Sequence, residues 1–220
     1  MVCDKKIKYN KRNRENMKED RKKEIIMATL RLAVQKGLSG VSMSMIADEV
    51  GIRKPSLYNH FSSKEMLLEE MYNYLRDKAT ESTQYRSMSL DKKLNNKTAE
   101  EVLINMVNGY IAMSYTGEMK MLYSVLYAER TINPDATKIL LEESDKMINA
   151  TKVVIGAMVK HNMLDIIDID IVATTFAITV HGLMDMEADR CFVAGGDKPM
   201  DMRLIERYIH NFCKEHACSR

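Results

Sequence analysis

The sequence predicts an all-α protein, and three features lead to this fold class. The 220 residues include only 9 glycines and 3 prolines, too few for the many turns of a β-sandwich or barrel. Methionine, which occurs 19 times, and the abundant Leu, Ile, Lys and Glu suit helices. Apolar residues recur at three- and four-residue spacing, the period of helices that bury one face.

Gly, Pro and capping residues divide the chain into about nine helices. Residues 1–17 are polar, basic and aperiodic, which predicts a disordered basic arm. The first helix follows, and Gly37 is expected to end it because glycine tolerates the left-handed conformation. Ser42 is expected to cap a short second helix that runs to Val50, and Gly51 then forces a turn.

The third helix is expected to be short, with Pro55 in its first turn, and to extend to Phe61. A capping box of Ser62 and Glu65 predicts the start of a fourth helix that runs past Asp77. An aperiodic segment predicts a hinge over 87–97. A second capping box, 98–101, opens a series of further helices, expected over 99–115, 118–130, 134–161, 170–192 and 200–216.

The charge is distributed unevenly along the chain. Residues 1–86 hold 18 Lys and Arg against 12 Asp and Glu, a net charge of +6, whereas residues 87–220 hold 15 against 19, a net charge of −4. A basic first part is expected of a chain that binds a polyanion there, although a solvated surface gives the same count. The hydrophobic share of 45% excludes a wholly disordered protein.

A soluble, cytoplasmic protein is expected, with no membrane partner. No apolar segment of signal-peptide length follows the basic N-terminus, and the uncharged run 171–180 has half the length that a bilayer requires. Four cysteines are too few for a disulfide framework and predict free thiols in a reducing compartment. They are Cys3, Cys191, Cys213 and Cys218.

Two short helices around a glycine turn, with a longer helix on each side, form the outline of a DNA-binding helix-turn-helix. Side chains at the start of the second short helix are placed to reach base edges; they are Arg53, Lys54 and Ser56. Hydroxyls and cations around it suit phosphate contacts; they are Ser42, Tyr58, His60 and Lys64. Packing alone also accounts for Tyr58, but a cation at a helix start, like Lys64, is unfavourable unless an anion approaches it.

A specific set of residues stands in register across this segment: Ile25-Ile26, Ala28-Thr29, Leu32, Gly37, Ile46-Ala47, Val50-Gly51-Ile52 and the run SLYNHFSSKEML over 56–67. This set resembles the TetR family of bacterial transcriptional regulators over about residues 21–70. The resemblance implies a three-helix DNA-binding domain, a linking fourth helix and a larger helical domain that binds a small molecule and dimerises. It gives the phosphate and base roles above to the same side chains, although Arg53 stands where the family commonly has a capping serine.

These features predict four parts: the arm over 1–17, a helix-turn-helix domain over 18–65, a linking helix over 66–86, and a ligand-binding and dimerisation domain over 87–220. Methionine and aromatic side chains of the last part form a candidate ligand site, because they make adaptable linings; ordinary core packing is the alternative. The candidates are Met106, Tyr110, Met113, Tyr123, Tyr127, Met158, Phe176 and His181, with Met184 beside them.

Two groups of polar residues in the C-terminal part are candidates for further sites. His181, Asp185 and Asp189 form a line at i, i+4 and i+8, which suits ligand orientation or a metal, or else an interface edge. Near the C-terminus, His210, Cys213, His216 and Cys218 crowd one helix end. Their spacing matches no standard zinc signature, so no metal and no cofactor are expected.

The function favoured by the sequence is a homodimeric repressor that a small hydrophobic or cationic molecule releases from a palindromic double-stranded DNA operator. The last two helices are expected to form the dimer interface. A small enzyme based on His181 or Cys213 lacks any supporting nucleophile, phosphate-loop or metal motif, so the chain is not expected to be an enzyme. The other alternative is a DNA-tethered protein-interaction regulator with no small-molecule ligand, which a core without a cavity would favour.

Overall fold

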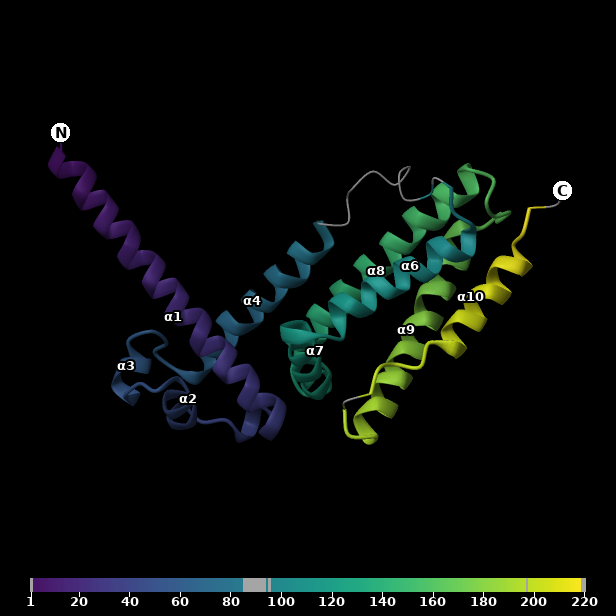
Figure 1. The fold of residues 1–220 in the computed structure, drawn as a ribbon. Helices are drawn as coiled ribbons and strands as arrows, with labels where there is room; N and C mark the ends of the chain where they lie inside the picture. Colours follow the sequence, from purple (N-terminus) through teal and green to yellow (C-terminus); the bar gives the residue numbers. More distant parts are fainter. Residues whose placement is uncertain (1, 85–93, 95, 197, 219–220) are drawn as a thin grey trace. The chain divides into compact units, whose positions relative to one another are not determined.

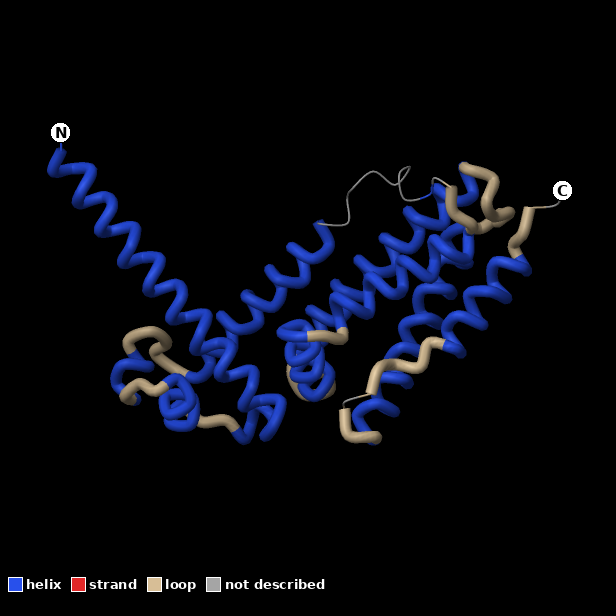
Figure 2. The backbone as a smooth tube through the Cα atoms, viewed as in Figure 1, coloured by secondary structure: helices blue, strands red, loops and turns tan. Residues whose placement is uncertain are grey.

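The computed structural model describes residues 2–84, 94, 96–196 and 198–218, and these residues form nine helices and no strand (Figures 1 and 2). The all-α prediction is confirmed. The chain divides into two compact units, one made of 1–78 with 121–139 and the other of 79–120 with 140–220. The predicted boundary at 86 and most of the hinge 87–97 lie outside the described residues, and the predicted domain limits stay predictions.

The first unit contains the predicted short helices. It holds α1 (Val2–Gly40), α2 (Met43–Val50), α3 (Lys54–Tyr58) and the first part of α4 (Lys64–Gln84) (Figure 1). The Ser42 hydroxyl caps α2 by accepting from the Met45 amide at 3.3 Å, and Gly51 ends it in the left-handed conformation with φ of 70°. Both predictions are confirmed. The buried core of these helices includes Ile25, Ile46, Leu57, Phe61 and Leu67.

Three details of this unit differ from the sequence prediction. Residues 2–17 continue α1 instead of forming a disordered arm, because the segment lacks Gly and Pro and extends a helix that packing has already nucleated. The third helix ends at Tyr58, short of Phe61. The fourth begins one residue later than expected: Ser63, not Ser62, accepts from the Met66 amide at 3.2 Å, so the predicted box of Ser62 with Glu65 is wrong.

The second unit is a bundle in which α6 (Ala99–Ser114), α8 (Pro134–Lys160), α9 (Ile169–Val193) and α10 (Arg203–Glu215) run side by side (Figure 1). Its core is apolar and draws on all four helices. Buried members include Leu103, Val107, Ile155, Phe176, Val180, Ile209 and Phe212. The helices α4, α7 (Gly117–Glu129) and α8 each have residues in both units.

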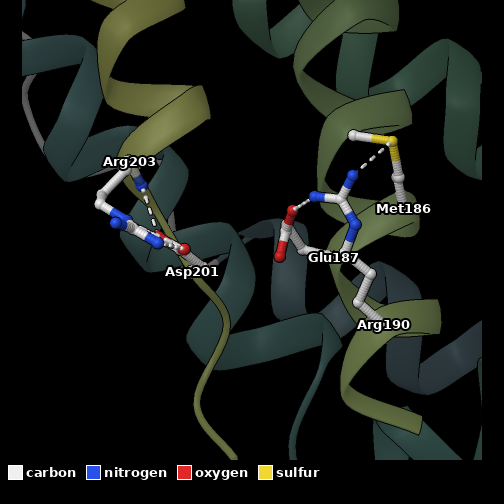
Figure 3. Close-up of polar contacts among 5 residues, drawn as sticks. All are labelled: Met186, Glu187, Arg190, Asp201 and Arg203. Atoms are coloured by element: carbon white, nitrogen blue, oxygen red, sulfur yellow. Dashed lines mark hydrogen bonds and ion pairs between the residues drawn. The ribbon is translucent and has the colours of Figure 1, made fainter. Parts of the chain in front are cut away.

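Two local ion pairs lie near the connection between α9 and α10, one inside α9 and one at the start of α10 (Figure 3). Buried Glu187 pairs with Arg190 within α9. Asp201 accepts from Nε of Arg203 at 2.9 Å, and hydrogen bonds from Arg203 lower the pKa of Asp201 to about 2. Asp201 also accepts from the Arg203 amide, so α10 starts at Arg203 rather than at residue 200 as predicted.

The helix α9 is longer and more apolar than the run 171–180 considered in the sequence. By length and composition, Ile169–Val193 meets the requirements for a membrane-crossing helix. It nevertheless packs Phe176, Val180 and Met184 into the bundle core, each at most 4% exposed. These contacts make α9 a central helix of the second unit.

The predicted capping box at the start of α6 is confirmed. The Thr98 hydroxyl accepts from the Glu101 amide at 3.2 Å, and the Glu101 carboxylate accepts from the Thr98 amide at 2.7 Å. Thr98→Ala is expected to lower the free energy of unfolding by about 1 kcal/mol, because one helix-end amide loses its partner. Urea unfolding followed by circular dichroism measures the change, with Thr98→Ser as the control that keeps the hydroxyl. Equal stabilities of wild type and Thr98→Ala would contradict the expectation.

Candidate nucleic-acid interface and ligand cavity

The start of α3 presents the two predicted base-reading cations to solvent. Arg53 and Lys54 are both exposed, while Leu57 is fully buried and holds α3 on the core. The Arg53 carbonyl accepts from the Ser56 amide at 2.8 Å, whereas its guanidinium makes no capping bond within the described residues. A guanidinium that is not used for capping can present its donors to a guanine edge.

Two predicted phosphate-contacting hydroxyls remain able to donate. The Ser42 oxygen accepts from the Met45 amide, which leaves the hydroxyl proton for a second partner. Tyr58 is 43% exposed at the end of α3. Both groups therefore fit the phosphate role predicted from the sequence. Ser56, which was predicted to approach a base, is partly buried.

Lys64 has a structural contact that the sequence did not indicate. Its Nζ donates to the Leu38 carbonyl at 2.7 Å, and so ties the start of α4 to the last turn of α1. This bond satisfies a helix-end carbonyl with a cation, which is a favourable pairing. An ammonium carries three protons, so two remain for a phosphate.

His60 lies beside three cations of α1 that the sequence reasoning missed. Burial, followed by the positive charges of Lys18, Arg21 and Lys22, lowers the pKa of His60 from 6.5. These cations stand at i, i+3 and i+4, so one helix face carries all three. This spacing of the three cations is the sequence signal from which the cluster could have been predicted. The cluster adds positive charge next to a predicted phosphate contact, although His60 Nδ1 itself is buried without a hydrogen-bond partner in the described structure.

The lowered pKa of His60 predicts a pH-dependent stability. As the pH falls through 6.5, His60 becomes protonated in the unfolded chain but stays neutral in the folded chain. The free energy of unfolding therefore decreases. We expect His60→Gln to flatten this part of the stability profile between pH 7 and pH 5. Urea unfolding at several pH values measures it. A variant profile as steep as that of the wild type would show that other groups cause the dependence.

The second unit contains a cavity of about 860 Å³. Its wall is formed by α6, α8, α9 and the residues just before α6. The lining residues of α6 lie between Val102 and Tyr110, and those of α8 between Lys146 and Val154, at the three- and four-residue spacing of one helix face. This volume is within the range of small-molecule sites.

Of the predicted ligand contacts, Met106, Tyr110 and Phe176 line this cavity, as does Met184. The others lie elsewhere. Met158 is fully buried in the core, Met113 is not on the wall, and Tyr123 and Tyr127 belong to the first unit.

His181 is not on the wall either. Its Nδ1 lies 3.3 Å from Asp185, and its ring packs edge-on against Tyr110 with centroids 6.0 Å apart. The Tyr115 hydroxyl donates to Asp185 at 2.7 Å. His181 thus contacts the wall from behind, through Tyr110.

The sequence reasoning overlooked the polar side chains of the cavity. Asn105, Asn149 and Thr151 line it together with Lys97 and Lys146. The polar residues share the periodic stripes of the apolar ones, but which stripes face each other depends on how the helices pack.

Histidine and cysteine side chains near the C-terminus contact other protein groups. His210 Nδ1 lies 3.1 Å from Glu100, and Cys218 donates to the Asn162 carbonyl. Burial and the charge of Glu100 raise the pKa of Cys213 to about 11, which favours the thiol over the thiolate that metals bind. In the described parts of the chain, no group of three or more His, Cys, Asp or Glu is arranged to hold a metal ion.

The helix-turn-helix unit matches a known family. Residues 25–71 match the family model of bacterial regulatory proteins, tetR family. The HTH-type transcriptional regulator YuxN of Bacillus subtilis is 47% identical over 60 residues, which are 27% of this chain and 21% of YuxN. The chain thus spans about a fifth of the length of this relative.

Two similarities extend beyond the helix-turn-helix. The HTH-type transcriptional regulator BetI of Vibrio vulnificus is 26% identical over 176 residues, which are 78% of this chain and 85% of BetI. A transcriptional regulator from Saccharomonospora viridis, solved in complex with choline, has a TM-score of 0.64 at 18% identity, over 92% of this chain and all of that chain. The fold is therefore that of solved transcriptional regulators.

Residues 25–71 are therefore similar to the DNA-binding part of the tetR family of bacterial regulatory proteins, and the relatives that match are HTH-type transcriptional regulators.

Proposed function

We propose that the protein is a cytoplasmic, ligand-responsive repressor that a small molecule releases from a palindromic operator. The observation that carries this proposal is an 860 Å³ cavity in the second unit of a chain whose first unit is a helix-turn-helix domain. A ligand that binds one conformation of the cavity more tightly shifts the population toward that conformation. If this conformation binds the operator less well, the ligand releases the DNA.

The helix α8 offers a covalent route between cavity and reading head. Its residues Lys146–Val154 contribute to the cavity wall, and its first turns belong to the unit that contains α1–α3. In that unit, Asn133 just before α8 donates to the buried Tyr72 hydroxyl of α4 at 3.0 Å. A movement of α8 on ligand binding would therefore reach α4, which directly follows the helix-turn-helix.

A homodimer is part of the proposal, with α9 and α10 as the interface. Ile171 and Ile178 lie on one face of α9, at i and i+7, and are 59% and 56% exposed. Leu204 of α10 is 42% exposed. Large exposed apolar side chains on two adjacent helices are typical of an association surface. Two copies related by a twofold axis would present two reading helices to a palindrome.

The ligand is expected to be largely apolar, because methionine, valine and aromatic side chains dominate the cavity wall. The choline-bound relative is consistent with the cationic ligand expected from the sequence, as an alternative to a purely hydrophobic one. The cavity itself counts against the protein-interaction alternative, which a densely packed core would have favoured.

The experiment that tests the proposal is a fluorescence-anisotropy titration of duplex DNA from upstream of the protein's own gene, compared with random duplex. We expect tighter binding to the upstream DNA, and affinity for both duplexes that falls as salt rises. Adding decanol or choline then tests release. Equal affinity for the two duplexes at moderate salt would contradict a specific regulator of its own gene, and binding that only strengthens with ligand would contradict a repressor released by ligand.

A further inference from the structure

The charged side chains of the cavity are all of one sign. Among the described residues of the wall, the only charged groups are Lys97 and Lys146, and no Asp or Glu is present. The neutral polar groups are those of two asparagines, a threonine and Tyr110, side-chain types that can donate hydrogen bonds to an anion. A quaternary ammonium would find no carboxylate on this wall, and its charge would meet two cations.

We propose that the ligand of this cavity is an amphipathic anion: an apolar chain with a carboxylate or a similar head group bound at Lys146. The inference rests on the proposed ligand-responsive function and adds the chemical class of the ligand.

Lys146 is the better head-group partner because it is the more buried of the two lysines. Its side chain is 32% exposed, whereas Lys97 is exposed. Screening by solvent weakens interactions at exposed charges. Glu143 lies 2.8 Å from the Lys146 Nζ but does not line the cavity.

The shape of the cavity fits an elongated molecule. The lining stripe of α6 extends over nine residues, from Val102 to Tyr110, or about 12 Å for eight steps of about 1.5 Å. The antiparallel course of α6 and α8 (Figure 1) places Lys97, before α6, and Lys146, at the start of the α8 stripe, toward opposite ends. An apolar chain between them would contact Met106, Val154 and Met184.

The chain contains a closely matched control for Lys146. Lys152 is on the same helix, pairs with Asp170 at 3.0 Å and is 31% exposed, but it does not line the cavity. Lys146→Met and Lys152→Met therefore remove the same charge from similar surroundings. Only the first removes it from the proposed site. Lys146→Arg keeps the positive charge. It therefore distinguishes loss of the charge from a general effect of substitution on folding.

The test is isothermal titration calorimetry of the DNA-free protein with three probes of equal chain length: decanoate, decanol and decyltrimethylammonium. We expect decanoate to bind at least ~10-fold more tightly than the cation. Lys146→Met should weaken decanoate binding ~10-fold and leave decanol within about twofold, while Lys152→Met and Lys146→Arg bind decanoate like the wild type. Cation binding as tight as decanoate binding, or unchanged decanoate binding by Lys146→Met, would overturn the proposal.

DNA release is measured separately, so the two proposals can fail independently. If decanoate binds with the expected charge preference but does not alter operator affinity, the ligand class stands and the repressor mechanism fails. If decanol or choline releases the DNA while decanoate does not bind, the repressor mechanism stands and the anionic ligand is excluded.

Discussion

Gly109→Trp is expected to abolish ligand binding while leaving DNA binding intact. Gly109 lies inside α6 on the cavity wall, and an added Cβ there meets no atom within 4 Å. An indole ring can therefore extend from this position and occupy space that the ligand needs. We expect the affinity for decanoate and for decanol to fall at least ~10-fold, since the cavity is filled whatever the head group.

Gly156 provides the control for this substitution. It is also a helical glycine with open space around an added Cβ, but it does not line the cavity. Gly156→Trp should bind both probes like the wild type. Calorimetry measures probe binding, and anisotropy with upstream DNA measures operator affinity. Full probe binding by Gly109→Trp would show that the ligand site lies elsewhere.

Arg53→Ala is expected to remove a large part of the preference for operator over random DNA. The guanidinium is exposed at the start of α3 and is not used to cap that helix within the described residues. A bidentate contact from arginine to a guanine contributes about 1–3 kcal/mol of discrimination. The ratio of the two affinities should therefore fall ~5-fold to ~150-fold, measured by anisotropy at one fixed salt concentration.

Two variants separate base reading from loss of charge and from phosphate anchoring. Arg31 is an exposed arginine of the same unit that pairs with Glu49, so Arg31→Ala should keep the preference. Tyr58→Phe removes only a hydroxyl proposed to contact phosphate, and should weaken binding to both duplexes alike. An unchanged preference in Arg53→Ala would assign base reading to other residues.

The helix-turn-helix followed from the sequence because its determinants are local. Ser42 and Gly51 act on the backbone within a few residues of themselves. The capping box at the start of α6, outside the helix-turn-helix, was predictable for the same reason, because it spans four residues. Such signals can be recognised in the sequence without knowledge of the rest of the chain. At the start of α4 the sequence predicted Ser62 as the cap, whereas the structure uses the adjacent Ser63.

The ligand site was predicted only in part, because it depends on which helix faces meet. Met106, Tyr110 and Phe176 were predicted and line the cavity, whereas Met158 has the same residue type but packs in the core. Residue type cannot separate these cases. Tyr127, on α7, was grouped with the others by composition but lies in the other compact unit.

The sequence by itself determined the all-α class, the helix-turn-helix and the residues at its surface, because helix periodicity and capping are properties of short segments. Only the tertiary structure decided the cavity, its basic wall and the second role of Lys64. Each of these depends on residues far apart in the chain. Lys97 and Lys146 line the same cavity, and Lys64 donates a hydrogen bond to the carbonyl of Leu38. Such contacts form when helices pack, and no local pattern encodes them.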